Sequence, residues 1–107
     1  MIENIDFNLD KNILKEIIEI SEKHPNIKRL VLFGSRARKD NLSKSDIDLA
    51  IYLDDNSSNL LDFIYDIENN TTTLLEFDFS NMNEIKDELF IKQVEQEGIT
   101  IYEKHWF

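Results

Sequence analysis

Residues 30–53 read LVLFGSRARKDNLSKSDIDLAIYL, and they are the most informative part of the sequence. Its first part, together with Arg29, is a short apolar run over 29–33 that predicts a buried strand. Its last part, DIDLAIYL at 46–53, alternates at first and then becomes wholly apolar, which predicts a second strand. The polar residues 35–45 between them predict a loop with one helical turn at its start.

Apolar residues elsewhere in the chain recur at the three- and four-residue spacing of helices. A first helix is predicted over 8–24 and ends before Pro25, because the residue before a proline disfavours the helical region. A second helix follows Ser57 or Ser58, either of which can cap it. The apolar stripes of these two helices comprise Leu9, Ile13, Leu14, Ile17, Ile18 and Ile20, and Leu60, Phe63, Ile64 and Ile67.

The C-terminal third of the chain predicts a strand, a helix and a short strand. TTLLEFDF at 72–79 is the strand, and the helix spans 82–97. Gly98 is expected at the C′ position in a left-handed conformation, and ITIY at 99–102 forms the last strand. The residues expected to point inward from this helix are Met82, Ile85, Leu89 and either Ile91 or Val94.

Length and composition fit one domain over residues 1–107, of the α/β (α+β) class, in which helices pack against a small mixed β-sheet. The absence of cysteine excludes disulfides, thiolate-bound zinc and thiol catalysis. The two glycines, Gly34 and Gly98, cannot form a dinucleotide-binding or P-loop glycine motif. A net charge of −10 repels nucleic acid and favours cations and basic protein partners. The N-terminal sequence does not resemble a signal peptide and no apolar run is long enough to span a membrane, so we expect a cytoplasmic protein.

Two aspartates at the start of the second strand are the first candidate site residues. Asp46 and Asp48 are two residues apart, so their carboxylates point to the same face of the strand. Two such carboxylates repel each other unless a cation lies between them. Oxygen ligands with open coordination positions suit Mg²⁺, which usually takes one or two carboxylates together with waters and phosphate oxygens.

Gly34 and Ser35 follow the first strand and are candidates for binding a phosphate. Such a junction offers backbone N–H groups to an anion, and Gly34 allows close approach because it has no Cβ. The Ser35 hydroxyl can add a hydrogen bond. Arg36, Arg38 and Lys39 follow directly; either they solubilise the loop, or Arg36 contributes to triphosphate binding. Carboxylates that bind a metal opposite a phosphate site are the minimal equipment for phosphoryl or nucleotidyl transfer.

A third acid lies on the next strand. Asp78 is flanked by Phe77 and Phe79, so we expect it to be buried between them and to reach Asp46 and Asp48. Glu76, two residues earlier on the same face, is the competing candidate.

The stretch over 30–53 closely resembles the signature of the DNA polymerase β-like nucleotidyltransferase superfamily, in which GS is followed after about ten residues by DxD. The ending EIKDELFIKQVEQEGITIYEK is similar to that of the minimal nucleotidyltransferase (MNT) family, which includes the antitoxins of HEPN/MNT toxin–antitoxin pairs. The resemblance implies that Gly34 and Ser35 hold the triphosphate of ATP. It also implies that Asp46 and Asp48 bind Mg²⁺ and that Asp78 is the third acid of the metal site. The family often has a glycine where this chain has Lys39, which leaves the loop conformation open.

The resemblance further implies a partner and an activity. Larger relatives carry an extra helical domain for the acceptor, so we expect the acceptor here to come from another chain, an all-helical HEPN-type toxin encoded nearby. The expected activity is Mg²⁺-dependent transfer of AMP from ATP to a hydroxyl of that toxin, with tyrosine as the expected acceptor. The alternatives are a non-catalytic module that masks the toxin by binding it and a transferase for a small molecule. A homo- or hetero-oligomer is compatible with either.

Two regions near element ends complete the predictions. His24 and His105 are expected at the surface without a chemical role. The C-terminal His105-Trp106-Phe107 ends in two large aromatic residues, which we expect either to pack back on the core or to contact another chain.

Overall fold

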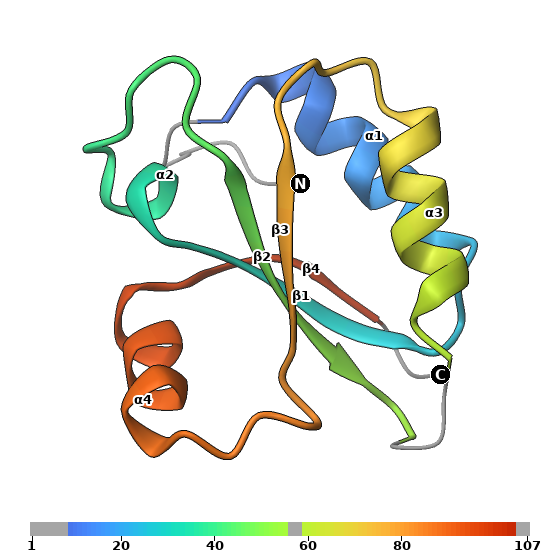
Figure 1. Cartoon of the computed structure of the whole chain (residues 1–107). Helices are drawn as coiled ribbons and strands as arrows, with labels where there is room; N and C mark the ends of the chain where they lie inside the picture. The colour runs from blue at the N-terminus through green and yellow to red at the C-terminus, as the bar shows by residue number, and fades with distance from the viewer. Residues whose placement is uncertain (1–8, 56–58, 105–107) are drawn as a thin grey trace.

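The computed structural model of the chain describes residues 9–55 and 59–104. Eight elements follow one another in the predicted order (Figure 1): α1 (Lys11–Glu22), β1 (Ile27–Phe33), α2 (Ser35–Arg38), β2 (Ile47–Leu53), α3 (Leu61–Asn70), β3 (Phe77–Asn81), α4 (Glu88–Glu97) and β4 (Ile99–Glu103). The predicted class is confirmed, because helices pack against a small mixed sheet. None of the described helices combines the length and apolar character that crossing a membrane requires.

The four strands form one sheet in the order β3-β2-β1-β4. β1 runs antiparallel to both β2 and β4, whereas β2 and β3 run parallel. A parallel pair needs a crossover connection, and α3 supplies it between β2 and β3. β3 therefore lies at one edge of the sheet, directly beside the strand that begins after Asp46.

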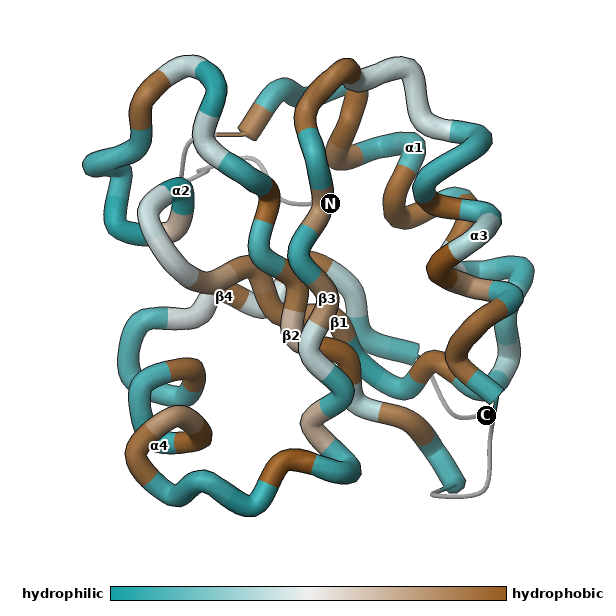
Figure 2. The backbone as a smooth tube through the Cα atoms, viewed as in Figure 1, coloured by the Kyte–Doolittle hydropathy of each residue, from teal (hydrophilic) through white to brown (hydrophobic). Residues whose placement is uncertain are grey.

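The sheet separates two hydrophobic layers. α1 and α3 cover one face and α4 covers the other, as Figure 1 shows. The larger layer contains fully buried residues such as Ile17, Ile47 and Phe63, and the smaller layer contains Val31, Ala50 and Val94. Figure 2 shows the apolar residues along the crossing strands, whereas the loop after α2 is mainly hydrophilic. Because side chains alternate along a strand, the even-numbered residues of β2 face the α4 layer.

α1 confirms the predicted inward stripe with different end points. Asp10 is its N-cap, and its carboxylate accepts hydrogen bonds from the N–H groups of Asn12 and Ile13 at 2.7 and 3.4 Å. This cap starts the helix at Lys11, whereas the apolar spacing alone placed the start at residue 8. The stripe residues Leu9, Ile13, Leu14, Ile17 and Ile20 are all buried, and Ile18 packs against them.

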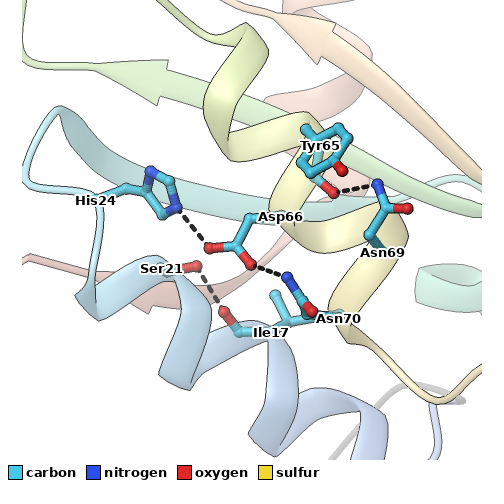
Figure 3. A network of polar contacts seen from close by, with 7 residues as sticks. All are labelled: Ile17, Ser21, His24, Tyr65, Asp66, Asn69 and Asn70. Atoms are coloured by element: carbon cyan, nitrogen blue, oxygen red, sulfur yellow. Dashed lines mark hydrogen bonds and ion pairs between the residues drawn. The ribbon is translucent and has the colours of Figure 1, made fainter.

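A polar network joins the C-terminal end of α1 to α3 (Figure 3). The imidazole Nε2 of His24 lies 2.8 Å from Oδ2 of Asp66, and Asn70 donates to the other carboxylate oxygen at 2.6 Å. The His24 ring also meets Phe63 edge-on, with the centroids 5.4 Å apart. The hydrogen bonds from His24, and then from Asn70, lower the pKa of Asp66. The prediction of a surface histidine without a chemical role missed this contact, because its partner lies 42 residues away.

The predicted strand over 72–79 and the predicted helix over 82–97 are both misplaced. β3 covers only Phe77–Asn81. Thr72, at the start of the predicted strand, instead donates its N–H to Glu16 Oε1 of α1 at 3.0 Å. α4 begins only at Glu88, where Asp87 caps it through the N–H groups of Leu89 and Phe90. The later start changes which side chains point inward: Val94 is buried, as one alternative predicted, but Leu89 is exposed.

The conformation predicted for Gly98 is also wrong. Its φ of −73° and ψ of 152° are extended, not left-handed, because the chain passes from α4 directly into β4. Glycine is nevertheless required there, since a Cβ would collide with the Val31 side chain and the Val94 carbonyl. The predicted caps Ser57 and Ser58 and the C-terminal 105–107 segment lie outside the described residues. The described cap of α3 is Leu60, preceded by Asn59, whose side chain accepts from the Leu61 N–H at 2.8 Å.

Candidate active site

The candidate site lies where β1 ends and β2 begins, on the α4 side of the sheet. Phe33 pairs with Asp48 in the antiparallel ladder, so Gly34 lies directly beyond this pair. Ile47 and Leu49 are fully buried on the opposite face and fix the orientation of the strand. Asp48 is consequently half-buried on the α4 face. Asp46, two residues earlier, faces the same side and is exposed.

Gly34 is shaped around the Asp48 carboxylate. Its φ of 76° and ψ of −156° lie in a region that only glycine occupies without strain. A Cβ at this position would collide with Oδ2 of Asp48. The glycine in the GS motif therefore has a steric role in this structure, namely to let the end of β1 approach the carboxylate of β2.

The electrostatic environment of Asp48 is unfavourable to its own charge. Burial is the main cause that raises the pKa of Asp48, and the negative charges of Asp78 and Asp46 raise it further. The positive charges of Arg38 and Arg36 oppose this rise in the pKa of Asp48 to a smaller extent. A carboxylate held among like charges at a half-buried position is suited to a cation that is not part of the chain.

Asp78 lies beside Asp48, but it is not buried as predicted. The two residues are register partners in the parallel β2–β3 pair, and Asp78 is exposed. Phe77 and Phe79 point to the other face, where their rings stack with centroids 5.7 Å apart. The expectation of burial was wrong because β3 is an edge strand whose site face is open.

The competing acid Glu76 precedes β3 and is also exposed. Its carbonyl accepts the Ile47 N–H at 2.9 Å, so its position continues the ladder beyond the strand. In this register Glu76 lies level with Asp46, whereas Asp78 lies level with Asp48. The structure thus offers Asp78 as the neighbour of the more buried carboxylate.

Arg36 has a clear structural role. It is buried, with an exposed fraction of 6%, and its guanidinium donates to the Ser45 carbonyl at 3.0 Å and the Ser43 carbonyl at 3.2 Å. These bonds fix the loop between α2 and β2 against the helical turn, and so fix where Asp46 emerges. Phosphate binding by Arg36 and by Ser35, which is half-buried at the start of the four-residue α2, stays a prediction.

Lys39 and Arg38 complete the loop. Lys39 adopts φ 67° and ψ 24°, a left-handed conformation that glycine adopts more readily than other residues. Arg38 forms ion pairs with Glu97 at 2.7 Å and Asp40 at 3.0 Å. Glu97 was missed by sequence reasoning, because it is the last residue of α4, 59 positions away, and no local pattern marks it.

Within residues 9–55 and 59–104, no group of three or more acidic or histidine side chains converges closely enough to hold a metal ion. The carboxylates present still fit Mg²⁺, since such sites commonly use one or two protein carboxylates and complete the shell with substrate phosphates and water. A separate cavity of about 600 Å³ opens on the α1 side, lined by the start of α1, Arg36, Ser43 and the segment before β3.

The chain is similar to known nucleotidyltransferases in sequence and in fold. The sequence profile described as polymerase beta, nucleotidyltransferase matches residues 15–106. Among curated proteins, none matches the chain significantly. A solved toxin–antitoxin complex with AMP-PNP superposes with a TM-score of 0.63 and 18% identity, over 85% of this chain and 73% of that one. The MntA–HepT toxin–antitoxin structure superposes with a TM-score of 0.59 and 17% identity, over 89% of this chain and 74% of that one. A structure of the tri-AMPylated Shewanella oneidensis HEPN toxin in complex with MNT antitoxin superposes with a TM-score of 0.57 and 17% identity, over 86% of this chain and 71% of that one.

Proposed function

Because the chain belongs to the polymerase beta nucleotidyltransferase family, we propose that it transfers AMP from ATP to a hydroxyl of a protein partner, with Asp46, Asp48 and Asp78 as its acidic residues. The observation that carries the proposal is Asp48, a half-buried carboxylate beside Asp78 and Asp46 that Gly34 accommodates by having no Cβ. A purely structural carboxylate would be expected to have a cationic partner in place of two acidic neighbours.

Each residue has a defined task in this proposal. Asp46 and Asp48 would hold Mg²⁺, which would neutralise charge on the phosphates. Gly34 and Ser35 hold the triphosphate, and Asp78 accepts the proton of the attacking hydroxyl. The hydroxyl oxygen forms a bond to the α-phosphorus while the bond to the bridging oxygen breaks, and pyrophosphate leaves.

The partner is proposed to be a helical HEPN-type toxin, and the function that of its antitoxin. Two of the superposed structures support this proposal by what they contain, a toxin–antitoxin complex with an ATP analogue and an AMPylated HEPN toxin. The net charge of −10 supports a basic partner through electrostatic complementarity. A tyrosine hydroxyl is the proposed acceptor.

Intact-mass spectrometry tests the proposal. The purified protein is incubated with ATP, Mg²⁺ and the helical protein encoded beside it, and the partner should gain the mass of AMP. Asp46→Asn should abolish the mass gain, whereas Asp62→Asn, an exposed acid in the first turn of α3, should leave it unchanged. Neutralisation of the partner without any mass change would instead establish the masking module.

A further inference from the structure

The outer edge of β3 has unused backbone hydrogen-bonding groups. The Glu76 carbonyl accepts from Ile47, and the Ile51 carbonyl accepts from Met82, both at 2.9 Å. In a parallel ladder every second residue bonds to the neighbouring strand, so the even-numbered residues of β3 bond to β2. The N–H and C=O groups of Phe77 and Phe79 therefore point away from the sheet. In the described part of the chain, no backbone or side-chain group bonds to them.

This edge lacks three of the usual protections against strand addition. Edge strands are commonly blunted by lysine, proline or a bulge. β3 reads FDFSN and pairs with β2 without a register shift. In Figure 1 it is the strand drawn in front, with α1 and α3 on one side and α4 on the other. In this view no described helix is drawn in front of β3.

The position of the edge connects it to the site. An added strand would run about 4.8 Å from β3, and every second side chain on it would face the same side of the sheet as Asp78. The side chain level with Asp78 would be its neighbour. Asp78 in turn is the register partner of Asp48. A hydroxyl-bearing residue on the added strand would thus lie on the same face as the carboxylates and one strand away from Asp78.

The chemistry around the edge specifies the occupant. Asp46, Glu76 and Asp78 are all exposed on the site face, which favours lysine or arginine on the added strand. On the opposite face the stacked rings of Phe77 and Phe79 are only half-buried, which favours apolar side chains. The fitting segment alternates basic or hydroxyl residues with apolar ones.

We propose that the outer edge of β3 binds an extended, basic segment of the acceptor protein as a fifth strand, with its hydroxyl residue facing Asp78. The proposal rests on the proposed function for the statement that the acceptor is a protein. Binding itself requires neither ATP nor a metal, so the two can fail independently.

The probe is the peptide acetyl-Val-Lys-Val-Tyr-Val-Lys-Val-amide, which places lysine and tyrosine on one face and valine on the other. Hydrogen exchange followed by NMR should show the Phe77 and Phe79 amides exchanging freely in the protein alone. The peptide should slow their exchange by about tenfold or more as it saturates the protein. The variant Asp48→Asn should bind the peptide within about twofold of the natural chain, because one charge beside the edge contributes little. This variant shows whether peptide binding is independent of catalysis.

The matched variants are Phe79→Pro and Phe79→Val. Both remove the ring, but only proline removes the outward N–H, and edge strands accept proline at such positions. Phe79→Pro should bind the peptide about fivefold more weakly than Phe79→Val, the effect of one hydrogen bond. If Phe79→Pro does not fold, peptides N-methylated on either the valines or the lysine and tyrosine residues replace it. One of these sets faces β3 and should lose binding, while the other should retain it.

Four results with the peptide would overturn the proposal. They are equal binding by the two Phe79 variants, equal binding by the two methylated peptides, unprotected Phe77 and Phe79 amides in the peptide complex, and absence of binding up to about 1 mM peptide. Protection of both amides in the free protein would also overturn it, since a second copy or the chain itself would then occupy the edge.

Discussion

Two partly buried aspartates show how differently one fold treats the same side chain. Asp66 on α3 lies between His24 and Asn70, and their hydrogen bonds lower its pKa. Asp48 on β2 lies beside Asp78 and Asp46, and burial together with these charges raises its pKa. The first carboxylate stabilises the packing of α1 on α3, whereas the surroundings of the second disfavour its charged form. The difference supports the proposal that Asp48 binds a ligand.

The largest expected effect follows from replacing Asp48. The variant Asp48→Asn should lower AMP transfer by on the order of 10³-fold, because a charged group that stabilises the transition state is lost. It should also raise the free energy of unfolding by at most about 1 kcal/mol, since solvent screens the relieved repulsion. Transfer assays and urea unfolding measure the two quantities. Full activity in this variant would remove Asp48 from the proposed site.

Gly34→Ala tests the site from the neighbouring strand. The new Cβ would collide with Oδ2 of Asp48 and would require a φ of 76° in a non-glycine residue, so a loss of about 2–4 kcal/mol in unfolding free energy is expected. Transfer should fall as well, because the Asp48 carboxylate must move.

Gly98→Ala is the matched control for the glycine variant. It meets a similar collision, with Val31 and Val94 in place of Asp48, at an ordinary φ of −73°. Gly98→Ala should lose stability and retain transfer. Equal loss of transfer in both variants would show that Gly34 acts through general stability alone.

The parts of the fold that local pattern determines could be predicted from the sequence. The two central strands and the inward stripe of α1 follow from apolar spacing, and the mixed sheet follows from their order. The start of α4 was misplaced because residues 82–87 continue an apolar spacing that looks helical, whereas the Asp87 cap starts the helix at Glu88, six residues later.

The residues of the candidate site could be proposed from the sequence, but their arrangement in space could not. Gly34, Asp46 and Asp48 stand close together in the chain, and the strand parity of the aspartates places them on one face. The exposure of Asp78 depends on β3 being the edge strand, which is a property of the whole sheet. The hydrogen bonds of Arg36 to the loop and the ion pair of Arg38 with Glu97 are likewise tertiary contacts, so no spacing in the sequence predicts them.

The smallest expected effect concerns Asp66 and its dependence on pH. Because the pKa of Asp66 is lowered in the folded protein, its contribution to stability is complete above the unfolded value of about 3.9 and is lost as the pH falls through the folded pKa. The variant Asp66→Asn should therefore be less stable than the natural chain by about 0.5–1 kcal/mol at pH 7 and equally stable in strong acid. Asp48→Asn should show the opposite sign: its advantage over the natural chain should appear as the pH rises above about 3.9, because the folded state holds the Asp48 proton more tightly. Urea unfolding of the three proteins at a series of pH values measures both differences, and transfer by Asp66→Asn should equal that of the natural chain. Two differences that change with pH in the same direction would contradict the contrast between a carboxylate paired for stability and one placed for a ligand.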